Sequence, residues 1–502
     1  MGTGPDRLTS AATERNVVAR PGVRRAPGCR NHPGGAAELR IPPQSIARWL
    51  RCPERAREPS PEVHVRRSGI SAGDTRGAGG VRYARGAGAA PGRPRGGRSA
   101  ASGAFVLGAL VAWTLATGPT AHAAPASAAC LLPRTQVHHS EGVDTAPAGY
   151  AKAQGDVQAL MVFLSFPDTP PALTPQEVAA DHYPATSDFY DQASYGKFRL
   201  HLHTVDRWVP MPHSATSYAI SRDWAAADRT AYLRDALTAA DPVVDFRGYD
   251  VVYLVADPDA PGVDSDATKV VNLASPVTLD GNPLARMVTV FERHPPDRNV
   301  LAHETGHVFD LPDLYYRPPV GSTADWDTHV GDWDLMGSQF GLAPEPFAWH
   351  KWKLGWLEPG QVGCITGTGT TYHDLSPDET PGGTKLLVVR TGADSALAIE
   401  ARSATGNDAT ACREGVLLYR VRSDRESGDG PIDVLDGHPG HSACAATSVY
   451  PPLADAPLGV GESYALPDGT TRVTVTGHEP DGAWAVKITE SAPGGDGAGR
   501  PG

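Results

Sequence analysis

The sequence predicts an α/β domain over residues 155–358, followed by an all-β, sandwich-like domain over residues 359–490. Up to about residue 358, apolar strand-like runs alternate with helical segments, which is typical of an α/β domain. Beyond this point, short alternating runs are separated by Gly, Asp and Pro turns, as in a β-sandwich. With 502 residues, of which 40% are hydrophobic and 20% charged, the chain is long enough for two such domains.

The N-terminal quarter differs in composition from the rest. Residues 1–123 hold 19 Arg and 7 acidic residues, whereas the remainder holds 26 basic and 50 acidic residues. Residues 1–92 are rich in Arg, Gly, Ala and Pro and cannot bury a core, so they are either a disordered basic extension or untranslated, with Val81 as a candidate start. The acidic remainder would be repelled by phosphates, which argues against nucleic acid as a partner.

A secretory signal peptide is predicted over residues 93–123. The basic stretch 93–98 precedes the apolar run 104–115, and the small-residue site Ala121-His122-Ala123 follows. The apolar run is too short to span a bilayer comfortably. We therefore expect a secreted protein that begins near residue 124, with a short N-terminal segment over 124–154 and no stable membrane anchor after cleavage.

The predicted mature chain contains four cysteines. An even number in an exported protein suggests two disulfides. We expect Cys412–Cys444 to close a C-terminal loop, and Cys130–Cys364 to tie the mature N-terminus to the domain junction. The alternative is that Cys130 is a free thiolate that blocks a metal until it is removed, which would leave an odd cysteine.

The individual elements follow from the hydrophobic pattern. In the α/β part we expect helices over 188–193 and 225–240, and strands over 155–168, 197–205, 249–256 and 287–292. The run 249–256 is almost continuously apolar, as in strands that a parallel sheet buries on both faces. In the β part we expect strands over 385–390, 396–402, 415–422, 471–476 and 484–489, and a disordered Gly/Pro-rich tail over 491–502.

One short motif carries recognisable chemistry, His303-Glu304-Thr-Gly-His307. Asp297 follows two prolines and can cap a helix that contains the motif. On that helix the two histidines lie one turn apart on the same face, which lets both imidazoles reach one tetrahedral zinc ion. Glu304 is displaced around the helix and can act as a general base on water at the metal.

A third ligand is needed to complete such a site. Pro312 disfavours helical geometry at the preceding residue, so we expect the helix to stop there and the chain to swing Asp313 back under the metal. Asp310 would then adopt a left-handed conformation, which Asp tolerates better than most residues. The expected ligands are His303, His307 and Asp313. Other candidates for the third position are Glu345, Asp334 and, more remotely, Asp310.

Four stretches, 189–197, 303–315, 333–337 and 349–357, together resemble the M6 (immune inhibitor A-like) secreted metalloproteases. The resemblance implies a zincin (metzincin-like) fold for residues 155–358 and a zinc-dependent endopeptidase acting on extracellular proteins or peptides. It also implies that Met336 forms a Met-turn that packs beneath the ligands. Asp310 stands where the family has Gly, so a catalytically degenerate binding protein is the alternative, and a different zinc hydrolase is a third.

A second candidate metal site is the acidic loop 257–266. Its four aspartates could bind calcium through their carboxylates. Their spacing is not that of an EF-hand, so a solvated acidic loop is the other interpretation.

Overall fold

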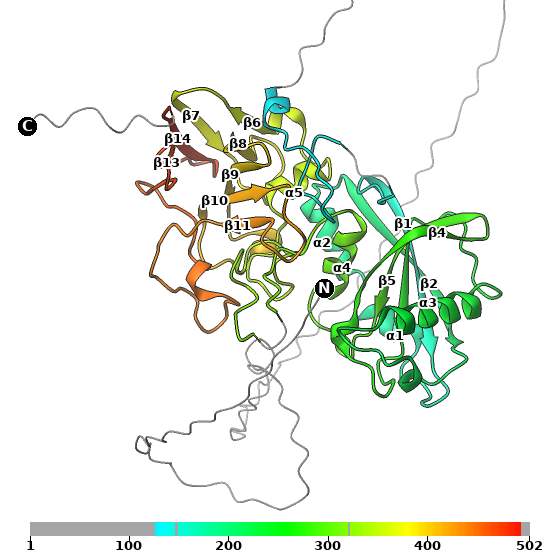
Figure 1. Cartoon of the computed structure of the whole chain (residues 1–502). Helices are drawn as coiled ribbons and strands as arrows, with labels where there is room; N and C mark the ends of the chain where they lie inside the picture. The colour runs from blue at the N-terminus through cyan, green and yellow to red at the C-terminus, as the bar shows by residue number, and fades with distance from the viewer. Residues whose placement is uncertain (1–125, 146–148, 320–321, 493–502) are drawn as a thin grey trace, which may run out of the picture. The chain divides into compact units, whose positions relative to one another are not determined.

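Three β-sheets organise the computed structural model, which describes residues 126–145, 149–319 and 322–492 (Figure 1). One five-stranded sheet with helices comes first, and a five-stranded and a four-stranded sheet follow. The order of an α/β part and then an all-β part agrees with the sequence prediction. The expectations for residues 1–92, for the signal peptide at 93–123 and for nearly all of the tail 491–502 lie outside the described residues. Among the described residues, no helix has the length and apolar character that a membrane crossing requires.

The first sheet has the strand order β2-β1-β3-β5-β4. The first four of these strands run parallel, and β4 runs antiparallel to β5 at the edge. The sequence analysis missed β4, because its apolar residues do not form one run and its pairing is interrupted between Asn272 and Val277. The strands are β1 (Gly155–Ser165), β2 (Phe198–Pro210), β3 (Val251–Ala256), β4 (Lys269–Leu279) and β5 (Asn282–Val290).

Apolar cores cover both faces of this sheet. Along β1, Ala159 and Met161 belong to the core that includes α2 and α4, whereas Leu160 and Val162 belong to the core that includes α3. This is the alternation that a strand imposes on its side chains. Strand β3 is buried throughout, as predicted for a strand covered on both faces. The helices are α1 (Pro175–Ala180), α2 (Ala185–Ala193), α3 (Ala226–Ala240), α4 (Val300–Val308) and α5 (Ala348–Lys353).

The second part contains the sheets β11-β10-β9-β8-β6 and β12-β13-β14-β7. Apolar residues of both sheets, such as Ile399 and Val486, form one shared core, as in a sandwich. The strands are β6 (Val362–Ile365), β7 (Gly369–Leu375), β8 (Leu386–Arg390), β9 (Ser395–Arg402), β10 (Gly415–Arg422), β11 (Ile432–Val434), β12 (Ser463–Ala465), β13 (Thr471–His478) and β14 (Trp484–Glu490).

The α/β and β parts are packed against each other through a common core. Val388 and Leu417 of the second part belong to the same buried cluster as Leu301 of α4 and Trp349 of α5. The boundary expected near residue 358 is therefore a change of architecture inside one packed body. Short 3-10 helices complete the description: Ala126–Cys130, Ala215–Tyr218, Ser265–Ala267, Pro359–Gln361, Gly406–Asp408 and Pro451–Leu453.

The two disulfides have the pairings expected from the sequence. Cys412 is joined to Cys444 within the β part, and Cys130 is joined to Cys364 of β6. The second bond fastens the first described residues of the chain to the β part. Because Cys130 is bonded in this way, it is not the free thiolate of the alternative interpretation.

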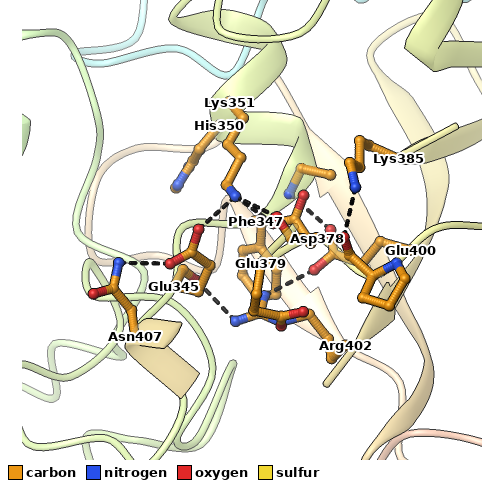
Figure 2. Close-up of polar contacts among 12 residues, drawn as sticks. Glu345, Phe347, His350, Lys351, Asp378, Glu379, Lys385, Glu400, Arg402 and Asn407 are labelled. Atoms are coloured by element: carbon orange, nitrogen blue, oxygen red, sulfur yellow. Dashed lines mark hydrogen bonds and ion pairs between the residues drawn. The ribbon is translucent and has the colours of Figure 1, made fainter. Parts of the chain in front are cut away.

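A buried cluster of charged side chains lies between α5 and the second sheet (Figure 2). The Nζ atom of Lys351 is 2.5 Å from a carboxylate oxygen of Glu345 and 3.1 Å from one of Asp378. On β9, Arg402 pairs with Glu400 at 2.8 Å and with two further carboxylates, Glu379 and Asp408. These side chains are fully buried, so the guanidinium and ammonium groups are the counter-charges for acids that water cannot reach.

Candidate metal centre

Helix α4 carries both histidines, but it begins later than predicted. Its N-cap is Asn299, which has a left-handed conformation and makes no side-chain capping bond. The backbone amide of Asp297 instead donates to the Glu292 carboxylate, and the turn at Asn299 separates Asp297 from the helix. The prediction that Asp297 caps the helix is therefore wrong. All nine residues of α4 are buried, as expected for a helix inside a core.

Three side-chain atoms converge beside this helix. Oδ1 of Asp313 lies 3.3 Å from Nε2 of His303 and 3.1 Å from Nε2 of His307. Zinc bonds of 2.0–2.2 Å in tetrahedral geometry separate neighbouring ligand atoms by about 3.3–3.6 Å, close to the distances found here. Oδ1 is also buried and has no hydrogen-bond partner. The three atoms therefore fit three corners of a zinc site, with the ligands that the sequence predicts.

Backbone carbonyl groups fix the orientation of both imidazole rings. Nδ1 of His303 lies 3.0 Å from the carbonyl oxygen of Leu335, and Nδ1 of His307 lies 2.7 Å from that of Leu311. A carbonyl oxygen only accepts, so each Nδ1 carries a proton and donates it. When the rings are neutral, each Nε2 keeps its lone pair, which is the arrangement found in metal-ligating histidines.

The electrostatics of the site favour a positive charge between these groups. Burial disfavours the charged form of His307, yet Asp313 outweighs burial and raises the pKa of His307 to about 9. Burial likewise opposes ionisation of Asp313, but His307 and His303 hold its pKa well below the ordinary value. A cation among these side chains would take the place of the extra proton and satisfy the same carboxylate.

Glu304 lies next to the ligands but is held differently. It offers a ligand atom within 4.8 Å of those of His303 and His307, but its Oε2 accepts a hydrogen bond from the backbone amide of Val270 on β4, at 2.6 Å. Burial raises the pKa of Glu304 above the ordinary value, although both histidines oppose this shift. Asp313 thus contacts both histidines directly, whereas one carboxylate oxygen of Glu304 is bonded to β4.

A Schellman turn ends α4. The backbone amide of Leu311 donates to the carbonyl of Gly306 at 3.1 Å, and the amide of Asp310 donates to that of His307 at 3.2 Å. The residue between the helix cap and Leu311 is Asp310, with φ 74°, so the left-handed conformation predicted for it is confirmed. The helix itself ends at Val308, so the prediction that Pro312 stops it is wrong.

Met336 packs against helix α4 at Gly306, near the C-terminal end of the helix, as the resemblance implies. A Cβ atom added at Gly306 would lie 2.6 Å from the sulfur of Met336, so glycine at this position makes room for it. The backbone amide of Met336 donates to Asp334, and its carbonyl accepts from the amide of Leu314, at 2.9 Å. This turn therefore supports the helix and the segment that leads to Asp313.

The other carboxylates considered as third ligand have different partners. Asp334 accepts from the amides of Met336 and Phe347 and pairs with His350. Glu345 pairs with Lys351 and accepts from Asn407 (Figure 2). Asp310 pairs with Arg134 and His139. Of the four candidates for the third ligand, Asp313 is the one that contacts both His303 and His307.

The acidic loop 257–266 does not form a comparable group. Asp264 accepts from the backbone amides of Arg222 and Asp266, and Asp257 accepts from that of Asp259. Among the described residues, the group around His303 is the only one in which three or more His, Cys, Asp or Glu side chains offer ligand atoms within 4.8 Å of one another. The calcium site thus gains no support from the structure.

The β part contributes a residue to this site that the sequence analysis missed. Oγ of Ser427 donates to Oδ2 of Asp313 at 3.0 Å and accepts from the amide of Asp313 at 2.8 Å. The amide of Gly428 donates to the carbonyl of Asp313. Ser427 lies 114 residues away in sequence, in the loop between β10 and β11, and no local pattern marks it. It orients the carboxylate of Asp313 toward the histidines.

We expect Ser427→Ala to weaken zinc binding by a factor of about 10–100, because outer partners of ligating carboxylates have effects of this size. The dissociation constant is measured by competition with a chromophoric chelator. Ser463→Ala, on β12 of the same part, is the matched control and should bind zinc like the wild type. Equal affinity of Ser427→Ala and wild type would show that Asp313 needs no help from the β part.

No protein-family model matches the chain, and no curated protein matches it either. Inferences about its activity therefore rest on the residues of the site and on their geometry.

Proposed function

We propose that the chain is a secreted zinc-dependent endopeptidase, similar to the M6 (immune inhibitor A-like) metalloproteases and built on a zincin-type fold. The strongest support is the convergence of His303 Nε2, His307 Nε2 and Asp313 Oδ1 at 3.1–3.3 Å, with Glu304 beside them. Three protein ligands that leave one position open are typical of catalytic zinc sites, whereas structural sites have four.

Zinc held by these ligands would polarise a peptide carbonyl and make a nearby water molecule more acidic. Glu304 would accept the proton of the attacking water and then return it to the leaving amine. Its hydrogen bond from Val270 holds the carboxylate on the side of α4 that faces β4. Its raised pKa suits a group that must first take and then release a proton.

Strand β4 supports a peptide as the substrate. It is the last strand in the order of its sheet and runs antiparallel to β5. An extended peptide can add to such an edge through main-chain hydrogen bonds. The bond between Val270 and Glu304 joins this strand directly to the base, so a peptide paired with β4 would pass beside it. A zinc hydrolase for small substrates has no need of such an edge.

Export is part of the same proposal. The signal peptide predicted at 93–123 would direct the chain out of the cell, and two disulfides are common in exported proteins. The substrates would then be extracellular proteins or peptides. A binding protein that keeps zinc but no longer cleaves is the alternative, suggested by Asp310 at a position where the resembled family has Gly.

The test is metal analysis of the secreted protein, followed by casein digestion with and without a chelator. We expect about one zinc per chain, digestion that the chelator abolishes, and recovery when zinc is added back. Zinc binding without digestion would favour the binding protein. Absence of zinc, or digestion that the chelator does not affect, would contradict the proposal.

A further inference from the structure

The N-terminal segment contacts the turn that follows α4. Nη2 of Arg134 lies 2.6 Å from Oδ2 of Asp310, and Nδ1 of His139 lies 3.3 Å from its Oδ1. Lys353 of α5 is 3.7 Å from the same carboxylate. Asp310 is 1% exposed, so these groups take the place of water around its charge.

Asp310 costs stability in two ways. A left-handed conformation is unfavourable for a residue other than glycine, although Asp tolerates it better than most. Burying a carboxylate without a partner costs further stability. Arg134, His139 and Lys353 surround the carboxylate and offset this cost with ion pairs and hydrogen bonds. The turn is therefore stable only while these cations and hydrogen bonds are present.

The same turn determines where two ligands lie. Leu311, directly after Asp310, supplies the carbonyl that orients His307, at 2.7 Å. Asp313 follows after Pro312, whose ring fixes its own φ angle. A change of conformation at residue 310 would thus move both the partner of His307 and the carboxylate of Asp313.

The segment that carries Arg134 is itself firmly attached. Oγ1 of Thr135 and Oγ of Ser140 both donate to the carbonyl of Ser423, at 2.5 and 2.7 Å. The amide of His138 donates to Glu426 at 3.1 Å. Ser423 and Glu426 belong to the loop that also holds Ser427 against Asp313. The segment therefore connects the turn at Asp310 with the loop that contains Ser427, and both of these lie next to Asp313.

We propose that Arg134 is a positioning residue for the metal site. By pairing with Asp310 it holds the left-handed turn that brings Asp313 to His303 and His307. The inference rests on the proposed zinc site and adds a role for residues 134–140 of the mature chain. That segment is then a permanent part of the site, and it is not an inhibitor that must be removed.

The test is a double-mutant cycle on zinc affinity, measured by chelator competition in the complete secreted protein. Arg134→Ala should weaken zinc binding by a factor of about 10–100. Asp310→Gly should stay within about threefold of the wild type, because glycine adopts the turn without strain and without a buried charge. Arg134→Ala in the Asp310→Gly background should cause no further loss.

Arg413→Ala is the matched control, since it removes a guanidinium from a 2.7 Å ion pair with Glu462 in the β part. It should leave zinc affinity unchanged. Melting curves of the metal-free proteins show that each variant is folded, and the visible spectrum of bound cobalt reports whether the carboxylate still ligates. If Arg134→Ala alone fails to fold while the double variant folds and binds zinc normally, the inference is supported.

Wild-type affinity in Arg134→Ala, or an equal loss in both backgrounds, would overturn the inference while leaving the proposed function intact. Higher proteolytic activity of Arg134→Ala at unchanged zinc affinity would also overturn it, because the segment would then be inhibitory. A wild type that binds no zinc would overturn the proposed function, and this inference with it.

Discussion

Glu304→Gln is expected to lower the rate of protein digestion by a factor of about 10²–10⁴ while zinc remains bound. Glutamine has the same shape, and its amide oxygen can still accept the hydrogen bond from Val270. It cannot take a proton from water, however, so the proton transfer in the proposed mechanism is lost. His303, His307 and Asp313 are unchanged, so zinc content should stay at about one per chain. Casein digestion and metal analysis on the same preparation measure both effects.

Glu292→Gln is the matched control for this experiment. Glu292 is also buried, and burial raises its pKa to about 7, but it lies two residues after β5 and accepts from the amide of Asp297. We expect this variant to digest casein at a rate close to that of the wild type. Equal activity of Glu304→Gln and wild type would rule out Glu304 as the base. Loss of zinc from Glu304→Gln would instead place Glu304 among the ligands.

The chemistry of the site could be predicted because most of it is local. His303, Glu304 and His307 lie on two turns of one helix, and Asp313 follows within six residues of His307. Helical periodicity alone places the two imidazoles together. The left-handed turn at Asp310 was also predictable, because a chain that leaves a helix abruptly needs such a residue. The error was to assign the helix end to Pro312, which lies four residues beyond the last helical residue, Val308.

The residues that the sequence did not reveal act over long distances. Ser427 and Arg134 contact the site from 114 and 176 residues away from Asp313 and Asp310, respectively. A serine or an arginine in a loop has no local signature, because its role depends on which strand pairs with which. Strand β4 was missed for a related reason. Its interrupted pairing removes the alternation of apolar and polar residues by which a strand is recognised.

Two of the other candidate ligands also show what the sequence alone does not reveal. Asp334 and Glu345 were the other carboxylates that the sequence offered as third ligand, and both are buried in the structure. Their partners, His350 and Lys351, lie on α5. Sequence alone cannot distinguish a carboxylate that awaits a metal from one that is neutralised by a neighbouring cation. The distances in the structure make this distinction for each residue.

The largest effect on stability is expected for Arg402→Met. The guanidinium of Arg402 is fully buried and pairs with Glu400 at 2.8 Å, Glu379 at 3.2 Å and Asp408 at 2.5 Å. It also donates to the carbonyl of Glu345. Methionine replaces part of the aliphatic volume but leaves three buried carboxyl groups without their shared counter-charge. Breaking a buried pair in this way costs about 3–5 kcal/mol. Denaturant unfolding at pH 8 measures the loss.

Arg413→Met is the control, because its ion pair with Glu462 is partly exposed, with about one third of each side chain accessible. Removing a pair of this kind costs about 0–1 kcal/mol. If both substitutions have equally small effects, the buried cluster does not stabilise the contact between α5 and the second sheet. A change in the slope of the unfolding free energy against denaturant concentration would indicate that the two parts of the chain no longer unfold together.

The loss of folding stability caused by Arg402→Met should also depend on pH. Burial raises the pKa of Glu400 to about 7, and Arg402 opposes this shift. A carboxyl group whose folded pKa is raised contributes stability below its unfolded value of 4.5, and this stability is lost as the pH rises through the folded pKa. In the wild type the contribution of Glu400 to this loss ends near pH 7. Without Arg402 the pKa rises further, so the variant should continue to lose stability above pH 7. The difference in the free energy of unfolding between wild type and variant should therefore be larger at pH 8 than at pH 5. A difference that stays constant or becomes smaller would mean that these carboxyl groups are not ionised beside Arg402.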